Sequence, residues 1–155
     1  MSLNFFCDVM LGKLARHLRM LGFDTKYSSS LSESMIIKST SMEKRILLTR
    51  RTKFLTSKVS IPFLFITSNH PETQLKEVID HYKISLEKLT PFSICLVCNT
   101  SLQDIERTLV EGKVPDYVFN TVKRFAQCPA CNKIFWKGTH FNNMVKRVDE
   151  ALKGE

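Results

Sequence analysis

The sequence is 155 residues long, 43% of its residues are hydrophobic, and its formal net charge is +8. This length suits one domain, or one domain with a small module, and the apolar content is sufficient for a buried core. No run approaches the roughly 18 consecutive apolar residues of a membrane span, which argues against a transmembrane protein or a membrane partner. The N-terminus shows neither a basic leader nor a cleavage site, so we expect a cytoplasmic location.

The positive charge is concentrated toward the N-terminus. Residues 1–58 contain 11 lysines and arginines against four acidic residues, whereas the two signs nearly balance over residues 59–155. A localised basic surface favours a polyanionic partner, because each neutralised phosphate releases a counterion. We therefore expect a nucleic acid as partner. The alternative is a solvated basic face that only aids solubility.

Strand and helix patterns alternate over the first 90 residues. Short apolar runs predict strands at 3–7, 23–27, 45–49 and 63–67. Helical periodicity predicts helices over 10–21 and 33–43 and from Pro71 onward, with Gly22 and Ser32 as caps. This alternation indicates an α/β domain with a mainly parallel sheet over residues 1–90.

A second module is expected over residues 91–155. A helix is predicted to start at Pro115, with Val118, Val122 and Phe125 on one face. Residues 139–152 have the apolar spacing of a terminal helix. The boundary between the two parts is placed near Thr90.

Two Cys-x-x-Cys pairs organise this second module. They consist of Cys95, Cys98, Cys128 and Cys131. Each pair can bind one edge of a tetrahedral zinc ion, and four thiolates leave no open position, so the site would be structural. The alternative is four buried or disulfide-bonded cysteines.

Polar residues at the predicted strand ends are candidates for chemistry. Asp8 ends the first strand, Arg50 and Arg51 follow the third, and Glu33 begins the second helix. The carboxyl ends of parallel strands share one edge, so Asp8 and Glu33 could bind Mg²⁺ or Mn²⁺ and position a water for phosphodiester hydrolysis. The alternative is that Asp8 caps the next helix and Glu33 is a solvated acid.

Several motifs in order resemble the Mut-seven C-terminal RNase domain family. They are Phe5-Phe-Cys-Asp8 with the helix up to Asp24, Arg45-Ile-Leu-Leu-Thr-Arg50, Gln74-Leu75, the two Cys-x-x-Cys pairs, Val114-Pro115, and Trp136-x-Gly138-x-His140. The family is similar to PIN domains. The resemblance implies a three-layer α/β/α fold, an acidic metal-dependent ribonuclease site containing Asp8 and Glu33, and a C-terminal zinc ribbon.

One position departs from the family pattern. A third acid normally follows the Leu-Thr-Arg run, and this chain has Arg51 there. A guanidinium competes with a cation for nearby carboxylates, so we expect weak or absent cleavage, with Arg51 paired to Asp8 or Glu33.

The basic half would still bind RNA, and the expected footprint has seven members. They are Lys13, Arg16, Arg19, Lys44, Arg50, Arg51 and Lys53. The layout of a PIN-like domain followed by a ribbon makes ribosomal RNA or the ribosome a conceivable partner. A competing hypothesis is a zinc-stapled protein-interaction adaptor whose charge is incidental.

Overall fold

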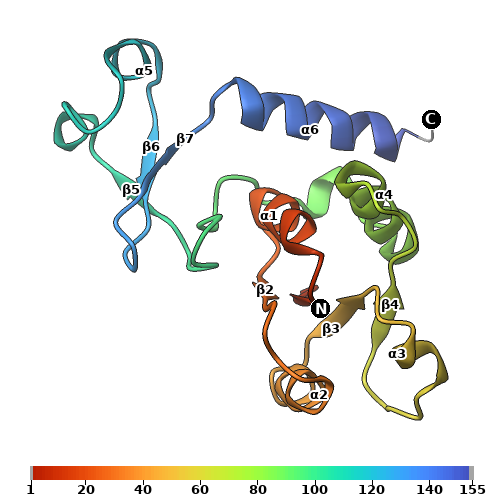
Figure 1. Ribbon diagram of the computed structural model, residues 1–155. Coiled ribbons are helices and arrows are strands. Elements are labelled where there is room, and N and C mark those ends of the chain that lie inside the picture. Colours follow the sequence, from red (N-terminus) through yellow and green to blue (C-terminus); the bar gives the residue numbers. More distant parts are fainter. Residues whose placement is uncertain (1, 154–155) are drawn as a thin grey trace.

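The N-terminal half is built on a four-stranded parallel sheet. The computed structural model describes residues 2–153. Its sheet has the order β2-β1-β3-β4, and every neighbouring pair is parallel (Figure 1). The strands are β1 (Phe5–Cys7), β2 (Thr25–Tyr27), β3 (Ile46–Thr49) and β4 (Phe63–Phe65). The helices that connect and follow them are α1 (Gly12–Met20), α2 (Glu33–Met42), α3 (Lys53–Thr56) and α4 (Pro71–Tyr82).

Helices cover both faces of this sheet, which gives the expected three layers (Figure 1). Side chains alternate along a strand, so Phe5 packs with α1 and α4, whereas Phe6 points to the opposite face. On that second face Phe6 packs with Ile36 of α2 and Phe54 of α3. The sheet therefore has two separate cores. Both are apolar because a buried parallel sheet needs cover on each side.

The predicted caps are present in the first half of the chain. Gly22 ends α1 with φ +97°, a backbone conformation that side chains rarely adopt. A Cβ atom there would also lie only 2.2 Å from Thr90 Oγ1, so Gly22 allows close approach of the segment that leaves the domain. The Ser32 hydroxyl accepts a hydrogen bond from Met35 N and caps α2.

The C-terminal part contains a small antiparallel sheet, which we call the ribbon. Its strands β5 (Gln103–Ile105), β6 (Phe125–Gln127) and β7 (Ile134–Trp136) pair in that order. Between β5 and β6 lie the short 3₁₀ helix η2 (Arg107–Leu109) and α5 (Asp116–Thr121); a further 3₁₀ helix, η1 (Leu86–Lys88), precedes the ribbon. The prediction that Phe125 continues the helix after Pro115 was wrong. Val122 is already extended, and Phe125 reaches Val118 from strand β6 across one apolar cluster.

The terminal helix α6 (Thr139–Leu152) matches the predicted range but packs on the N-terminal half. Met144 and Val148 are buried in the same core as α1 and α4. Figure 1 shows α6 running along α4. Arg147 also pairs with Glu72 at the start of α4. The helix therefore belongs to the three-layer core in space, although it follows the ribbon in sequence. Among the described residues no helix is long and apolar enough to cross a membrane.

Candidate functional site

Asp8 lies at the carboxyl edge of the parallel sheet and is fully buried. Its Oδ1 accepts a hydrogen bond from Val9 N at 2.7 Å, and its Oδ2 accepts one from Thr49 Oγ1 at 2.8 Å. Arg51 Nε lies 2.9 Å from the same Oδ2. The Asp8 side chain has no exposed surface, whereas 24% of Arg51 is exposed. The predicted ion pair is present, and it satisfies a carboxylate that would otherwise be costly to bury.

Glu33 begins α2 at the same edge but does not join Asp8. Its carboxylate lies 3.5 Å from Lys53 Nζ, and Lys53 is 79% exposed. The Nη2 of Arg51 donates to Leu31 O at 3.4 Å. The two acids therefore have separate basic partners. A pocket shared by Asp8 and Glu33 stays a prediction.

These residues do not fit a divalent cation. Both oxygens of Asp8 already accept hydrogen bonds, and the nearest charged atom is a guanidinium nitrogen. In the described part of the chain, no group of three or more potential ligands includes Asp8 or Glu33. Mg²⁺ and Mn²⁺ prefer several oxygen ligands in near-octahedral geometry. Arg51 therefore occupies the side of Asp8 that a cation would need.

The seven basic residues expected to bind RNA do not form one surface. Lys44 precedes β3, whereas Arg50 and Arg51 follow it, so they lie at opposite edges of the sheet. Arg50 donates to the backbone oxygens of Thr67 and Ser68 and to Asn69 Oδ1, which holds the loop after β4. Sequence patterns place charges along the chain, but strand direction decides which edge each charge occupies.

Three of the seven remain exposed on the carboxyl-edge side or along α1. They are Lys13, Arg16 and Lys53. Lys13 lies in the first turn of α1, where Gly12 lets the Tyr27 ring of β2 pack closely. Lys44 is also exposed, but it lies at the opposite edge of the sheet.

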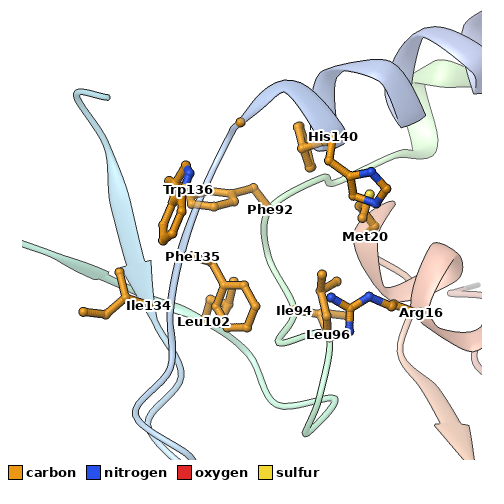
Figure 2. Close-up of a pocket in the computed structure, with 12 residues that line it drawn as sticks. Arg16, Met20, Phe92, Ile94, Leu96, Leu102, Ile134, Phe135, Trp136 and His140 are labelled. Atoms are coloured by element: carbon orange, nitrogen blue, oxygen red, sulfur yellow. The ribbon is translucent and has the colours of Figure 1, made fainter. Parts of the chain in front are cut away.

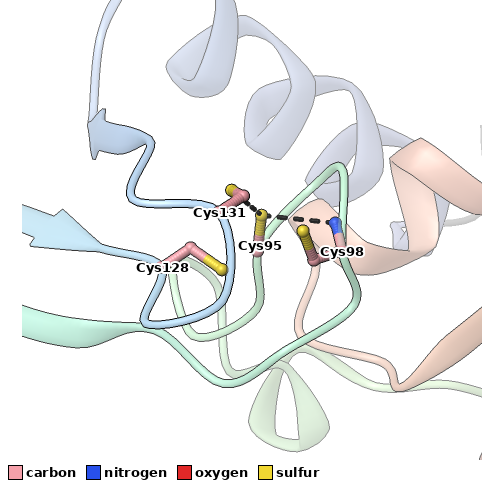
Figure 3. Close-up of side chains that lie close together, drawn as sticks. All are labelled: Cys95, Cys98, Cys128 and Cys131. Carbon is pink, nitrogen blue, oxygen red and sulfur yellow. Dashed lines mark hydrogen bonds between the residues drawn. The ribbon is translucent and has the colours of Figure 1, made fainter.

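The four predicted cysteine ligands converge at the junction of the ribbon and the N-terminal half (Figure 3). Their Sγ atoms all lie within 4.8 Å of one another, and Cys95 Sγ lies 3.8 Å from Cys131 Sγ. A tetrahedral ion with bonds of about 2.3 Å to sulfur separates its ligands by about 3.8 Å. The cluster therefore has the size and donor chemistry of a closed tetrahedral metal site.

The two Cys-x-x-Cys turns have the same backbone geometry. Cys95 N donates to Thr100 O and Asn99 N donates to Cys95 O, and the second turn repeats this pattern from Cys128. Asn99 and Asn132 adopt φ of 60° and 64°, a conformation that asparagine tolerates better than most residues. Cys98 N also donates to Cys95 Sγ (Figure 3). The Cys98 N–H group thus points at the Cys95 sulfur.

Hydrogen bonds to the sulfurs distribute the negative charge unequally. Burial alone would raise the pKa of Cys128, but the N–H groups of Cys131 and Ala130 outweigh it, and the pKa falls to about 7. The hydrogen bond with Cys131 raises the pKa of Cys98 to about 12. Metal binding must displace the remaining protons, so metal affinity at this site depends on pH.

Arg19 and Asn99 clasp the first cysteine turn to the sheet, which the sequence did not predict. Arg19 Nη1 donates to Leu96 O at 2.8 Å and Arg19 Nε donates to Thr25 O at 2.8 Å. The Asn99 amide accepts from Thr25 N and donates to Asp24. Arg19 is therefore a structural cation and not a free phosphate ligand. In the sequence Asn99 directly follows Cys98, a position typical of a tight turn, and this gives no sign of a contact with β2.

A cavity of about 280 Å³ lies between the ribbon, α1 and the start of α6 (Figure 2). Phe92 and Phe135 line it together with Trp136, while Arg16 and His140 also border it. Sequence reasoning quoted Trp136-x-Gly138-x-His140 as a motif but did not place these residues at a cavity. All three motif residues line it.

The comparisons with known proteins give one match. The family model described as Mut7-C RNAse domain matches residues 3–148, which is nearly the whole chain. The comparisons with curated proteins and with solved structures gave no match. The matched segment contains the three-layer domain, the four-cysteine cluster and most of α6. The chain therefore belongs to the Mut7-C RNAse domain family.

Proposed function

We propose that this protein binds RNA through a PIN-like domain whose metal-dependent cleavage site is closed by Arg51. The family assigns an RNase domain to nearly the whole chain. The observation that carries the proposal is the ion pair between Arg51 Nε and Asp8 Oδ2 at 2.9 Å. Displacing it would require a cation to break an ion pair at a carboxylate with no exposed surface. We therefore expect binding without efficient cleavage.

The exposed cations supply the proposed contact with RNA. Lys13 and Lys53 flank the carboxyl edge, and neither is sequestered by backbone oxygens as Arg50 is. Each phosphate contact should contribute to the salt dependence of binding. Lys13→Glu and Lys53→Glu should each reduce the log–log salt slope by roughly one. Lys44→Glu is the matched control, because Lys44 lies at the opposite edge of the sheet.

We also propose Zn²⁺ as the ion of the four-cysteine cluster. Four thiolates at tetrahedral spacing suit zinc, and a closed shell makes the ion structural. When bound, zinc would cross-link the two cysteine turns. The hydrogen bonds of Arg19 and Asn99 with Thr25 would connect the cross-linked turns to β2. Elemental analysis of protein purified without chelators should give one zinc per chain.

The cleavage site is tested with four proteins. Wild type, Asp8→Asn, Arg51→Gln and Arg51→Asp are assayed for Mn²⁺ binding by calorimetry and for cleavage of labelled single-stranded RNA. We expect weak or absent wild-type cleavage. Arg51→Asp should gain Mn²⁺ affinity and cleavage by adding a ligand, and Arg51→Gln separates that gain from loss of the guanidinium. Robust wild-type cleavage that Asp8→Asn abolishes, with no gain from Arg51→Asp, would sink the proposal.

Ribosomal RNA as the specific partner and the cytoplasm as location are also proposals. Co-sedimentation of the purified protein with ribosomal subunits at rising salt tests the first. Fluorescence microscopy of a tagged chain tests the second. RNA binding without salt dependence would favour the adaptor hypothesis instead.

A further inference from the structure

The cavity beside the ribbon combines aromatic walls with a basic rim. Trp136 and Phe135 come from β7, Phe92 from the segment before the first cysteine turn, and Arg16 from α1 (Figure 2). At about 280 Å³ it lies near the lower end of small-ligand pockets, which begin at about 300 Å³. One flat group fits such a space, and a helix or a strand of a partner protein does not.

Phe92 is held in a strained backbone conformation at this cavity. Its φ is +67°, which is a genuine outlier for a bulky side chain. Such strain persists only when the surroundings hold the residue, and it concentrates at ligand clamps and active sites. The Phe92 ring packs edge-on against Phe141 with centroids 6.3 Å apart. The fold therefore holds this ring at the cavity in spite of the backbone strain.

Positive charge surrounds the aromatic residues. Lys137 Nζ lies 5.7 Å from the Phe92 ring centroid and 5.8 Å from that of Phe141. Arg124 lies 5.7 Å from the Phe92 ring, but Asp104 pairs with it at 3.0 Å. Among the described residues, neither Lys137 nor Arg16 has an acidic partner within ion-pair distance. An apolar ligand alone would not need these cations, whereas a group with an aromatic ring and an anion uses both features.

We propose that the cavity takes one unpaired base of a bound RNA strand, with adjoining phosphates on Arg16 and Lys137. This inference rests on the RNA binding proposed above and adds a second contact site away from Asp8. Bases of single-stranded RNA stack on aromatic side chains and on guanidinium planes. Phe92 and Trp136 supply the aromatic surfaces, and the rim supplies the charge that tracks the backbone. A duplex keeps its bases stacked and should not fill the cavity.

Trp136 makes the proposal directly measurable, because it is the single tryptophan of the chain. Emission of Trp136 is recorded while a short single-stranded RNA is titrated, and anisotropy of an end-labelled copy reports total binding. We expect saturable quenching with single-stranded RNA and little with the matching duplex. An oligonucleotide of the same length with abasic sites throughout is the third probe, and it should bind without quenching.

A matched pair of variants tests the stacking partner. Phe92→Leu removes the ring at the cavity but keeps an apolar side chain. Phe119→Leu makes the same change in α5 at a ring covered by Arg107 at 4.0 Å, outside the cavity. We expect Phe92→Leu to weaken single-strand binding by roughly 5-fold or more, the lower end for losing one base–aromatic stack, and Phe119→Leu to leave it unchanged.

The outcomes separate this inference from the proposed function. Anisotropy that rises while Trp136 emission stays constant would overturn the base pocket and leave RNA binding intact. Equal quenching by the abasic strand would overturn it too, because phosphates alone would then explain the signal. Equal losses in both variants would assign the effect to stability and overturn the stacking role. No anisotropy change with any RNA would overturn the proposed function itself.

Discussion

The ion pair of Asp8 and Arg51 predicts strong energetic coupling between these two residues. Arg51→Gln removes the basic partner of a carboxylate with no exposed surface. Leaving one buried polar group without its partner costs roughly 1–3 kcal/mol, more for a charged group, and breaking a fully buried pair costs about 3–5 kcal/mol. Asp8 keeps its hydrogen bonds from Val9 N and Thr49 Oγ1, and Arg51 is 24% exposed. We therefore expect the lower range, about 1–3 kcal/mol.

A double-mutant cycle isolates the pair itself. The free energies of unfolding of wild type, Asp8→Asn, Arg51→Gln and the double variant are measured by urea titration at fixed zinc concentration. The coupling energy should be about 1–3 kcal/mol, within the range found for contacting residues.

Glu33 and Lys53 provide the matched control cycle at the same edge. Their charged atoms lie 3.5 Å apart and Lys53 is 79% exposed, so the coupling should stay below about 1 kcal/mol and fall with added salt. An Asp8–Arg51 coupling no larger than that of the control would refute the reasoning. It would mean that the guanidinium is a replaceable neighbour of Asp8, and that a cation could take its place at little cost.

Three further predictions concern the core, the cysteine cluster and pH. Met144→Ala should lower the free energy of unfolding, measured by urea titration, by about 2–5 kcal/mol, because Met144 is buried against the N-terminal core. The control Met42→Ala, at a side chain that is 74% exposed, should change it by less than about 0.5 kcal/mol. Cys98→Ser should remove the bound metal and speed amide hydrogen exchange in both the ribbon and β2, while exchange in β3 and β4 stays slow. Fast exchange confined to the ribbon would contradict the view that Arg19 and Asn99 connect the first cysteine turn to β2. Burial lowers the pKa of His17, so the stability that its neutral form contributes is present above about pH 6.5 and is lost as the pH falls toward the lowered pKa. His17→Gln should make the melting temperature depend less on pH in that window, which thermal melts at several pH values can check.

Several parts of the fold follow from local sequence patterns. Short apolar runs are sufficient to predict three of the four parallel strands, β1, β3 and β4, because strands covered on both faces contain few polar residues. Gly22 and Ser32 mark helix ends through backbone conformations and hydrogen bonds that are local. The four cysteines were predictable as one cluster for a similar reason, since two Cys-x-x-Cys turns each carry their own geometry.

Other parts depend on contacts between distant segments. Strands β5 and β6 are three residues each and include polar residues, so neither an apolar run nor periodicity identifies them, and Phe125 was misassigned to a helix. The terminal helix was predicted, but its packing partner was not, because an amphipathic pattern shows that a face is buried and not against what.

The candidate site divides in the same way. The sequence by itself determined that Asp8 ends a buried strand, that Arg51 stands where the family has an acid, and that both lie near one edge of the sheet. Only the tertiary structure decided that Arg51 Nε forms an ion pair with Asp8 and that Glu33 lies beside Lys53. It also decided that Arg19 and Arg50 donate hydrogen bonds to backbone oxygens. The physical reason is that a long basic side chain can reach several partners. The partner it takes depends on which buried acceptors the assembled chain leaves unpaired.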